Sequence, residues 1–300
     1  MKGLKIVKDI DKANFITHSG KFHIDDVFST AFLANYFGDV RLKRVYNIED
    51  IEKNSEKIVY DIGYGKFDHH QVNALRRQDG TIYSSFGLLW KEYGKSFLRK
   101  NNCDDIDFAW KKFDNFLVKT IDKIDNSQIE PEFQNYYLIS NIIENYNSTW
   151  DSNDKSDDNF LKAVNFANNI LKNEIKSIFS IIKAKKFLEN KYDLINDNFI
   201  VLEKYIPYHD FILEKDTEEK IQFVIYPSKR NGIEIRTVLD RKKFPKLWHS
   251  MNEKEFYKKY GIKGMLYCHS NGKLCIVGNI ESAKKNYRID IKQNICYNQY

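Results

Sequence analysis

Residues 14–37, with the sequence NFITHSGKFHIDDVFSTAFLANYF, decide the fold. Residues 14–17 predict a short buried strand that runs into the polar turn HSGK. Residues 26–37 follow with helical periodicity, and Asp25 and Asp26 stand at the N-terminus of this helix, where carboxylates suit the helix dipole. A strand, a polar loop and a helix in this order begin an α/β fold.

The alternation of strand and helix continues through the first half of the chain. Residues 41–48 predict a second strand, and residues 57–62 (KIVYDI) predict a third. The apolar and β-branched residues of the third strand are typical of a strand that is covered on both faces. Helices are expected over residues 84–97 and 106–124. This order predicts a mostly parallel sheet with covering helices.

The pattern changes in the second half of the chain. An acidic loop is expected over residues 151–159, and a helix that links two domains over residues 160–192. Five short strands and one helix, at residues 253–260, are expected after it. The expected strands are residues 199–202, 221–226, 234–238, 265–268 and 274–277. The sequence therefore predicts two domains, an α/β domain over residues 1–197 and a smaller α+β domain over residues 198–300.

The composition is that of a folded protein without a membrane span. Hydrophobic residues make up 42% and aromatic residues 15% of the 300 residues, which excludes a disordered chain. No apolar run approaches the ~18 residues of a transmembrane helix, and the N-terminus has no apolar signal core. Four cysteines without a C-x-x-C pair exclude a disulfide scaffold and a zinc finger. We expect a soluble, intracellular protein, cytoplasmic by default, with an organelle or the nucleus left open.

The positive charge is concentrated in the C-terminal third of the chain. The net charge is +6; residues 198–300 contain 19 basic and 12 acidic side chains, whereas residues 1–197 contain 29 and 30. Because basic surface attracts phosphate, a polyanionic partner is one interpretation. Ordinary solvated lysines are the other, because the density is modest for a nucleic-acid binder.

Four of the seven histidines fall in the first quarter of the chain, beside several aspartates. They lie in two strings, THSGKFHIDD (17–26) and DIGYGKFDHHQ (61–71). Imidazoles and carboxylates without cysteine are ligands for a divalent ion such as Mn, Fe or Zn. Loops beyond the carboxyl ends of neighbouring parallel strands converge on one crevice. The residues expected to meet there are His18, His23, Asp25, Asp61 and His69.

A pair of metal ions would account for so many ligands in one place. Close carboxylates repel one another strongly unless a cation lies between them. Two ions that share a bridging carboxylate generate hydroxide and stabilise an in-line phosphoryl displacement. Each residue also has a simpler interpretation: Asp25 or Asp26 caps a helix, and Asp68 orients a neighbouring histidine.

These strings resemble those of a known superfamily. The triplet Asp68-His69-His70, preceded by an aspartate that closes a strand and by a His-x4-His-x-Asp string, resembles the DHH phosphoesterase superfamily. More closely, the chain resembles the melanocyte-proliferating-gene family, formerly labelled metal-dependent protein hydrolases. The resemblance extends over nearly the whole chain. It rests on residues 17–26, 59–71, 76–94 (RRQDGTIYSSFGLLWKEYG), 118–127 (VKTIDKIDNS), 221–227 and 260–272 (YGIKGMLYCHSNG).

The resemblance implies a Rossmann-like catalytic domain and a smaller substrate-binding domain. It also implies a Mn²⁺- or Mg²⁺-dependent phosphodiesterase with two ions, and for this branch a 3′–5′ exonuclease that acts on single-stranded RNA. The metal ligands implied by position are His18 and His23 for one ion, Asp25, His69 and Asp122 for the other, and Asp61 as the bridge. Roles at the substrate are implied for His70 at the scissile phosphate, Asp68 as support of the histidines, and Arg76 and Arg77 as phosphate clamps.

The chain departs from the family pattern at some positions. The common first motif of the superfamily has aspartate where His23 stands. Asp122 and Asp125 lie three residues apart on one helical face; only one need be a ligand, and we choose Asp122. In the C-terminal domain His269 and Gly278 are the expected substrate contacts, although Gly278 is the one glycine that remains where the family is glycine-rich.

Other activities use the same candidate site. A phosphatase or phosphodiesterase of small substrates, such as short oligonucleotides, cyclic dinucleotides or pyrophosphate, requires the same metal ligands. A peptidase is disfavoured because the set contains no general-base glutamate. A non-catalytic RNA-binding protein would require a broken site, whereas every candidate ligand is present.

Overall fold

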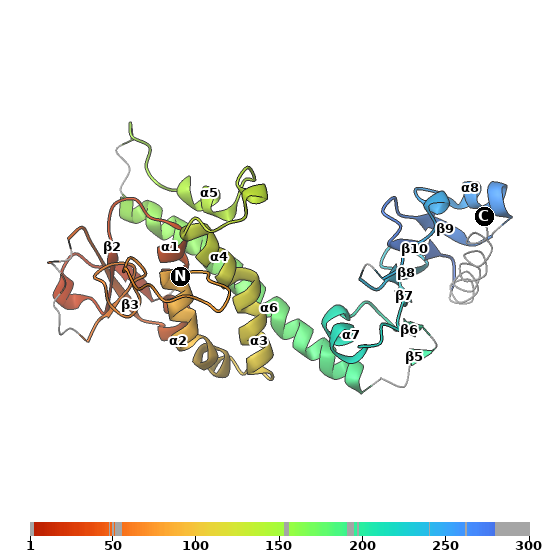
Figure 1. Cartoon of the computed structure of the whole chain (residues 1–300), viewed down its shortest axis with the longest axis horizontal. Coiled ribbons are helices and arrows are strands. Elements are labelled where there is room, and N and C mark those ends of the chain that lie inside the picture. The colour runs from red at the N-terminus through yellow and green to blue at the C-terminus, as the bar shows by residue number, and fades with distance from the viewer. Residues whose placement is uncertain are drawn as a thin grey trace. The chain divides into compact units, whose positions relative to one another are not determined.

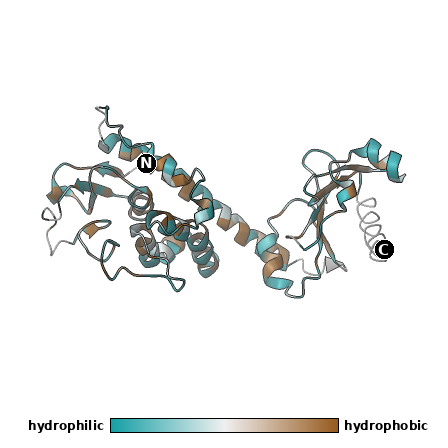
Figure 2. Cartoon of the chain, turned by 45° about the horizontal axis from the view of Figure 1, so that its top comes forward, coloured by the Kyte–Doolittle hydropathy of each residue, from teal (hydrophilic) through white to brown (hydrophobic). Residues whose placement is uncertain are grey.

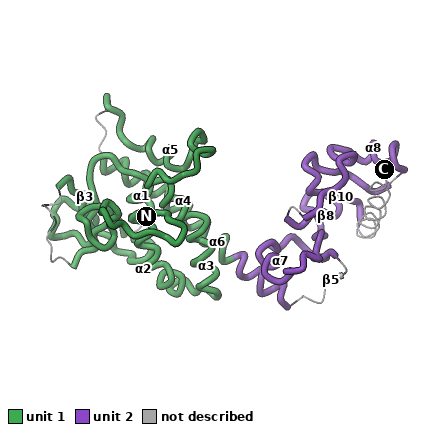
Figure 3. The backbone as a smooth tube through the Cα atoms, in the orientation of Figure 1, with its two compact units in different colours: residues 1–179 green, residues 180–300 purple. Residues whose placement is uncertain are grey.

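The computed structural model describes residues 3–47, 49, 51, 56–152, 156–190, 195–196, 198–239, 241–261 and 263–279. The chain divides into two compact units, Met1–Phe179 and Ser180–Tyr300, coloured green and purple in Figure 3. The boundary between the units falls inside one long helix, α6 (Ser156–Glu189). Each unit is described by itself below.

Unit 1 is built on a parallel sheet of four strands. The order across the sheet is β1-β3-β2-β4, and every neighbouring pair is parallel. The strands are β1 (Leu4–Ile6), β2 (Phe15–His18), β3 (Val40–Val45) and β4 (Ile58–Val59). This confirms the predicted α/β class with a parallel sheet. The short strand β1 was not predicted.

Two long helices pack together beside this sheet (Figure 1). Helix α1 (Ile24–Phe37) buries its first eleven residues, so polar side chains in its first turn are shielded from solvent. Helix α2 (Ser85–Lys100) begins at the N-cap Ser84, whose side chain accepts a hydrogen bond from a backbone amide of the first turn. Aromatic rings join the two helices, with the Phe32 and Trp90 centroids 5.5 Å apart.

The helix expected over residues 106–124 is interrupted. It consists of α3 (Ile106–Phe113), a π-helical turn (Asp114–Val118) and α4 (Lys119–Asp125). A π-helical turn inserts one residue per turn into the helix and is frequent at functional sites. Unit 1 also contains α5 (Ile139–Glu144) and 3₁₀ turns at Ile10–Lys12 and Pro131–Phe133.

Several predicted boundaries differ from the structure. The strand expected over residues 57–62 is limited to Ile58–Val59 because Asp61 has a left-handed backbone, with φ of 57°. The strand expected over residues 41–48 ends at Val45, and position 48 lies outside the described residues. In the expected acidic loop, residues 156–159 already belong to α6, and residues 153–155 lie outside the described part. The last two residues of the helix expected to reach position 192 also lie outside it.

Unit 2 is built on a mixed sheet of six strands in the order β5-β6-β7-β8-β10-β9. Strands β6 and β7 are parallel, and the other neighbours are antiparallel. The strands are β5 (Ile195–Asn196), β6 (Phe199–Val201), β7 (Phe223–Pro227), β8 (Ile233–Thr237), β9 (Met265–Cys268) and β10 (Leu274–Val277). The helices are α7 (His209–Lys215), which was not predicted, and α8 (Glu253–Tyr260), which was; a 3₁₀ turn forms at Lys246–Trp248.

Apolar and polar residues alternate along α6, as the interleaved brown and teal ribbon of Figure 2 shows. A helix with one apolar face packs against a protein core along that face. Among the helices in the described ranges, none is long and apolar enough to cross a membrane.

Candidate metal centre

The loop between β2 and α1 supplies the first side chains of the site. His18 is the last residue of β2, and Asp25 and Asp26 lie in the first turn of α1, both buried. The backbone amide of His23 donates to Asp26 Oδ1 at 2.9 Å, so this carboxylate caps the helix and its orientation is fixed. Asp26 Oδ2 lies 3.2 Å from His18 Nε2.

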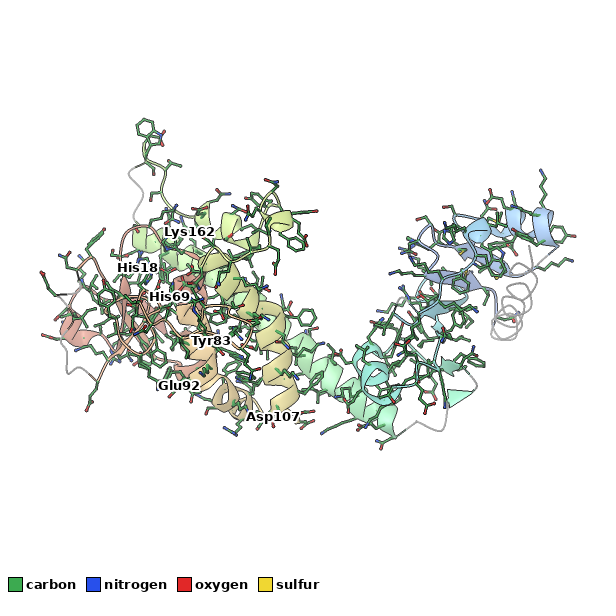
Figure 4. The ribbon with its side chains drawn as sticks, in the orientation of Figure 1. His18, His69, Tyr83, Glu92, Asp107 and Lys162 are labelled. Carbon is green, nitrogen blue, oxygen red and sulfur yellow. The ribbon has the colours of Figure 1, made fainter. Side chains whose placement is uncertain are left out.

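Asp61 occupies the centre of the cluster. It follows β4 and is buried. Its Oδ2 lies 3.1 Å from His18 Nε2, and its Oδ1 lies 3.5 Å from His69 Nδ1. The Ser85 hydroxyl donates to the same Oδ1 at 3.1 Å. One carboxylate thus faces histidines from two separate segments of the chain. Figure 4 labels these two histidines, His18 and His69.

Asp68 holds His70 in place. Its Oδ1 lies 2.8 Å from His70 Nδ1 and accepts the His70 backbone amide at 3.1 Å, while Oδ2 accepts the Tyr64 amide at 2.7 Å. Burial acts to raise the pKa of Asp68, but these hydrogen bonds outweigh it and lower the pKa. The bond to Asp68 raises the pKa of His70. The His70 side chain is 57% exposed, so an oriented imidazole reaches solvent from this loop.

His69 faces a second pair of carboxylates. Its Nε2 lies 3.1 Å from Asp125 Oδ2, and its Nδ1 lies 3.8 Å from Asp25 Oδ2. The Ser85 backbone amide, at the start of α2, donates to Asp25 Oδ2 at 3.2 Å. Helices α1, α2 and α4 therefore each contribute one group around His69.

The charges of the cluster are poorly balanced by the protein itself. Burial raises the pKa of Asp25 well above its ordinary value, and the nearby carboxylates of Asp125, Asp61 and Asp26 raise it further. Burial acts to lower the pKa of His18, but Asp26 and Asp61 outweigh it and raise the pKa to about 11. Asp25 Oδ1 is buried and has no hydrogen-bond partner among the described residues.

The arrangement fits divalent metal ions. In the part of the chain that the structure describes, three groups of side chains each bring their ligand atoms within 4.8 Å of one another. The groups are His18, Asp26 and Asp61; Asp25, His69 and Asp125; and Asp61, Asp68, His69 and His70. Imidazole nitrogens with carboxylate oxygens suit borderline and hard divalent ions, and a cation offsets the repulsion among the buried carboxylates. These buried groups could therefore hold metal ions.

Asp122 lies in a different environment from Asp125. Its Oδ1 accepts the amide and the hydroxyl of Ser84 at 2.9 and 2.7 Å, and its Oδ2 accepts Arg77 Nε at 2.8 Å. Arg77 also forms two bonds to Asp114, at 2.5 and 2.9 Å, and its guanidinium lies over the Tyr83 ring. Burial raises the pKa of Asp122 to about 6 although Arg77 opposes this. Asp122 and Arg77 are thus partners of each other inside the protein.

The remaining candidates are not members of these groups. His23 is exposed at the N-cap of α1, with its ring centroid 5.8 Å from that of His18. Arg76 is exposed, and its Nη1 donates to the Gly80 carbonyl. His269 and Gly278 belong to unit 2, at the ends of β9 and β10.

Sequence reasoning did not select three residues of the cluster. Asp26 was interpreted only as a possible cap, and Asp125 was the alternative to Asp122. Ser85, which donates to Asp61 and Asp25, was not considered. The spacing of Asp122 and Asp125 is a signal that one of them is used, but it does not indicate which one faces the histidines.

An α/β protein with buried His/Asp groups at the carboxyl ends of parallel strands is the class that this fold and site define. The chain belongs to the MYG1 family: the family model MYG1_exonuc, described as "Uncharacterised protein family (UPF0160)", matches residues 14–287. This match confirms the resemblance seen in the sequence, and the name of the family model is that of an exonuclease family.

Curated relatives match over most of their length. A MYG1 protein of Dictyostelium discoideum is 25% identical over 296 residues, which cover 85% of this chain and 89% of that protein. A MYG1 protein of Chlamydia pneumoniae is 26% identical over 295 residues, covering 92% and 96%. A MYG1 protein of Caenorhabditis elegans is 24% identical over 302 residues, covering 85% and 88%. No solved structure matches the chain.

Proposed function

We propose that this protein is a metal-dependent phosphodiesterase that removes nucleotides from the 3′ end of single-stranded RNA. The observation that carries the proposal is the sharing of ligands between groups: Asp61 and His69 each belong to two of the three His/Asp groups. Two ions with a shared carboxylate form the arrangement used for in-line phosphoryl displacement. The exonuclease name of the family model supports hydrolysis from an end.

The proposed ligands divide into two sets. His18, Asp26 and Asp61 hold one Mn²⁺ or Mg²⁺ ion. Asp25, His69 and Asp125 hold the other, with Asp61 as the bridge. Asp125 replaces Asp122 in this proposal because Asp125 contacts His69, whereas both oxygens of Asp122 are bonded to Ser84 and Arg77. Bound ions of this kind lower the pKa of a water molecule and polarise a phosphoryl group.

Residues outside the ligand sets position the substrate. His70 is held at Nδ1 by Asp68 and is half exposed, so its Nε2 donates a hydrogen bond to a phosphate oxygen. Arg76 is exposed and is the phosphate clamp of this proposal. Arg77 is bonded to Asp114 and Asp122 and instead fixes α4.

The division of labour between the parts of the chain belongs to the same proposal. Residues 1–197 contain all the proposed ligands and form the catalytic domain, and residues 198–300 bind the substrate. The positive excess of residues 198–300 supports this assignment because RNA is a polyanion.

The test uses metal-stripped protein and a 5′-labelled single-stranded RNA. With Mn²⁺ added, we expect a ladder that shortens from the 3′ end. The variant Asp61→Asn removes the shared carboxylate charge, and we expect it to lose the ladder by at least 100-fold in rate, about 2.7 kcal/mol of barrier. The matched control is Asp107→Asn, because Asp107 is 84% exposed on α3 and pairs only with Lys95 among the described residues.

Two outcomes contradict the proposal. In the first, wild-type protein binds Mn²⁺ and leaves RNA intact but hydrolyses pyrophosphate or a dinucleotide. The protein is then a phosphatase or phosphodiesterase of small substrates. A ladder that persists in Asp61→Asn at the rate of Asp107→Asn removes the shared carboxylate from the mechanism.

A further inference from the structure

A large pocket lies entirely within unit 2. Its volume is about 1110 Å³, slightly above the range of ~300–1,000 Å³ that is typical of small-molecule sites. Its walls come from the segment before α7, from β7 and the turn after it, and from strands β8, β9 and β10. None of the candidate metal ligands lines it.

Strand alternation explains why polar side chains gather on this face of the sheet. In β8, Ile233 and Ile235 pack into a core of buried residues on one face, whereas Glu234 and Arg236 point to the other. Tyr226 of β7 is the register partner of Glu234. The pocket therefore lies on part of the second face of the sheet, beside the apolar core that includes Val224.

Tyrosine rings form one wall of the pocket. Tyr226 and Tyr208 are buried, and Tyr205 lies edge-on to Tyr226 with centroids 5.4 Å apart. Tyr205 is nevertheless 50% exposed, and Tyr267 on β9 is 37% exposed. Exposed rings that rest on buried rings are rigid platforms, and base stacking on such rings is a principal mode of single-stranded nucleic-acid recognition.

Positively charged side chains also line the pocket. Among the described residues that line it, four are lysine or arginine, and Glu234 is the single carboxylate. The basic residues are Lys204, Lys229, Arg230 and Arg236. Glu234 is already bonded to Ser228 Oγ and to Arg236 Nε, each at 3.0 Å. Within the described ranges Arg236 has an acceptor only at Nε, so its two terminal nitrogens remain to bind a phosphate oxygen.

His269 adds an oriented donor at the edge of the pocket. The Asn271 backbone amide donates to His269 Nδ1 at 3.2 Å, which places the proton of the neutral ring on Nε2. This histidine is therefore a donor toward an acceptor in the pocket.

We propose that this pocket binds a nucleotide of a single-stranded nucleic acid, with the base stacked on Tyr205 and the phosphates held by Arg236, Lys229 and Arg230. The inference rests on the proposed function, since it assigns the part of the chain that grips the strand. Stacking on an aromatic face accepts any base, so the pocket recognises single strands without a sequence preference. In a duplex both faces of a base are already stacked on the neighbouring base pairs, so a duplex binds weakly.

The test measures binding without catalysis. The full-length Asp61→Asn protein, kept in a chelator, is titrated into a fluorescently labelled single-stranded RNA, and anisotropy reports the Kd. We expect Tyr205→Ala in this background to raise the Kd about 5-fold or more, whereas Tyr205→Phe keeps the Kd because it keeps the ring. The matched control is Tyr257→Ala, since Tyr257 is 54% exposed on α8 and does not line the pocket.

A second pair of variants tests the phosphate contacts. We expect the double variant Lys229→Gln/Arg230→Gln to weaken binding and to reduce its salt dependence, in contrast to Lys254→Gln/Lys258→Gln on the exposed face of α8. Equal Kd values for Tyr205→Ala and Tyr257→Ala overturn the inference. Competition by inorganic phosphate as strong as that by RNA also overturns it, because the pocket is then an anion site without base recognition.

The design separates this inference from the proposed function. If the protein binds single-stranded RNA through Tyr205 but does not shorten it with Mn²⁺, the assignment of the pocket stands and the proposed exonuclease activity is wrong. If wild type and Tyr205→Ala shorten RNA at equal rates and have equal Kd values, the proposed exonuclease activity stands and the assignment of the pocket is wrong.

Discussion

Asp122 and Asp125 lie one helical turn apart on α4, yet their surroundings differ. Asp122 is fixed by Ser84 and by the Arg77 guanidinium, whereas Asp125 faces His69 and Asp25. The hydrogen bond from His69 contributes to lowering the pKa of Asp125, although burial opposes this. A buried carboxylate with a permanent cation as its partner has a structural role, and one that faces only histidine and another carboxylate is suited to a metal ion.

The two aspartates should therefore respond differently to the same substitution. We expect Asp125→Asn to weaken Mn²⁺ binding at least 10-fold, measured by calorimetry, with little change in the unfolding of the metal-free protein. We expect Asp122→Asn to lower the free energy of unfolding of unit 1 by roughly 2–4 kcal/mol, because it removes a charge that Arg77 pairs with. The reverse pattern, in which Asp122→Asn loses metal and keeps stability, would restore Asp122 as the ligand.

At the scale of the element, α2 approaches α4 closely because residue 87 is glycine. A Cβ atom on Gly87 would lie 2.3 Å from Asp122 Oδ1 and 2.7 Å from Oδ2. That carboxylate cannot move away easily, because Ser84 and Arg77 hold both of its oxygens. The absence of a Cβ atom at residue 87 is thus a condition for the ion pair that fixes α4.

A substitution at this glycine tests the close approach. Replacing glycine by alanine in a helix ordinarily stabilises by up to about 1 kcal/mol, but here we expect Gly87→Ala to destabilise by about 1–3 kcal/mol in denaturant unfolding. In the double variant Gly87→Ala/Asp122→Ala the contact is absent, so the cost of the alanine should vanish or change sign. An unchanged cost in the double variant would place the strain elsewhere.

The accuracy of the predicted elements follows the strength of their local signals. Helix α8 was predicted with its bounds because Asn252 caps it and Gly261 ends it with a left-handed backbone. Strand β1 and helix α7 contain three and seven residues, too few for a periodic pattern to stand out. The interruption of α3 by a π-helical turn depends on tertiary packing around Asp114, which has no sequence signature.

At the scale of the whole molecule, unit 2 has a buried ion pair of its own. Asp216 accepts the amides of Lys220 and Ile221 at 3.0 and 2.9 Å and pairs with the Arg241 guanidinium. Burial acts to raise the pKa of Asp216, but the Ile221 amide, Arg241 and the Lys220 amide outweigh it and lower the pKa. This group ties the end of α7 to the segment before β7 and to the chain after β8.

Because the pKa of Asp216 is lowered in the folded state, the contribution of Asp216 to stability depends on pH in a definite direction. The stabilisation by Asp216 is present above its unfolded pKa of about 3.9, and it is lost as the pH falls through the lower pKa of the folded state. We expect the protection of β7 amides from hydrogen exchange to fall as the pH is lowered from about 5 toward 3, after correction for intrinsic rates. In Asp216→Asn the protection should be lower at pH 7 and its pH dependence flatter. A wild-type profile in the variant would exclude this linkage.

In the candidate metal centre, the sequence identified residues that lie in local motifs, whereas contacts that depend on packing could not be predicted from it. The two His/Asp strings and the parallel sheet were sufficient to bring His18, Asp25, Asp61 and His69 together, because strand ends converge. Which of the two neighbouring carboxylates on α4 faces the histidines was not predictable, since it depends on where Arg77 lies. The pocket of unit 2 draws on residues from 204 to 276, which no local pattern connects.

The left-handed backbone at Asp61 restricts which residues evolution can place there. Residues other than glycine, asparagine and aspartate are sterically strained at a φ of 57°, and β-branched residues are strained the most. Of the three tolerated residues, only aspartate carries a negative charge. The shape of the main chain and the need for an anion therefore favour the same residue independently. A residue that replaces Asp61 must adopt the left-handed backbone conformation as well as supply the negative charge.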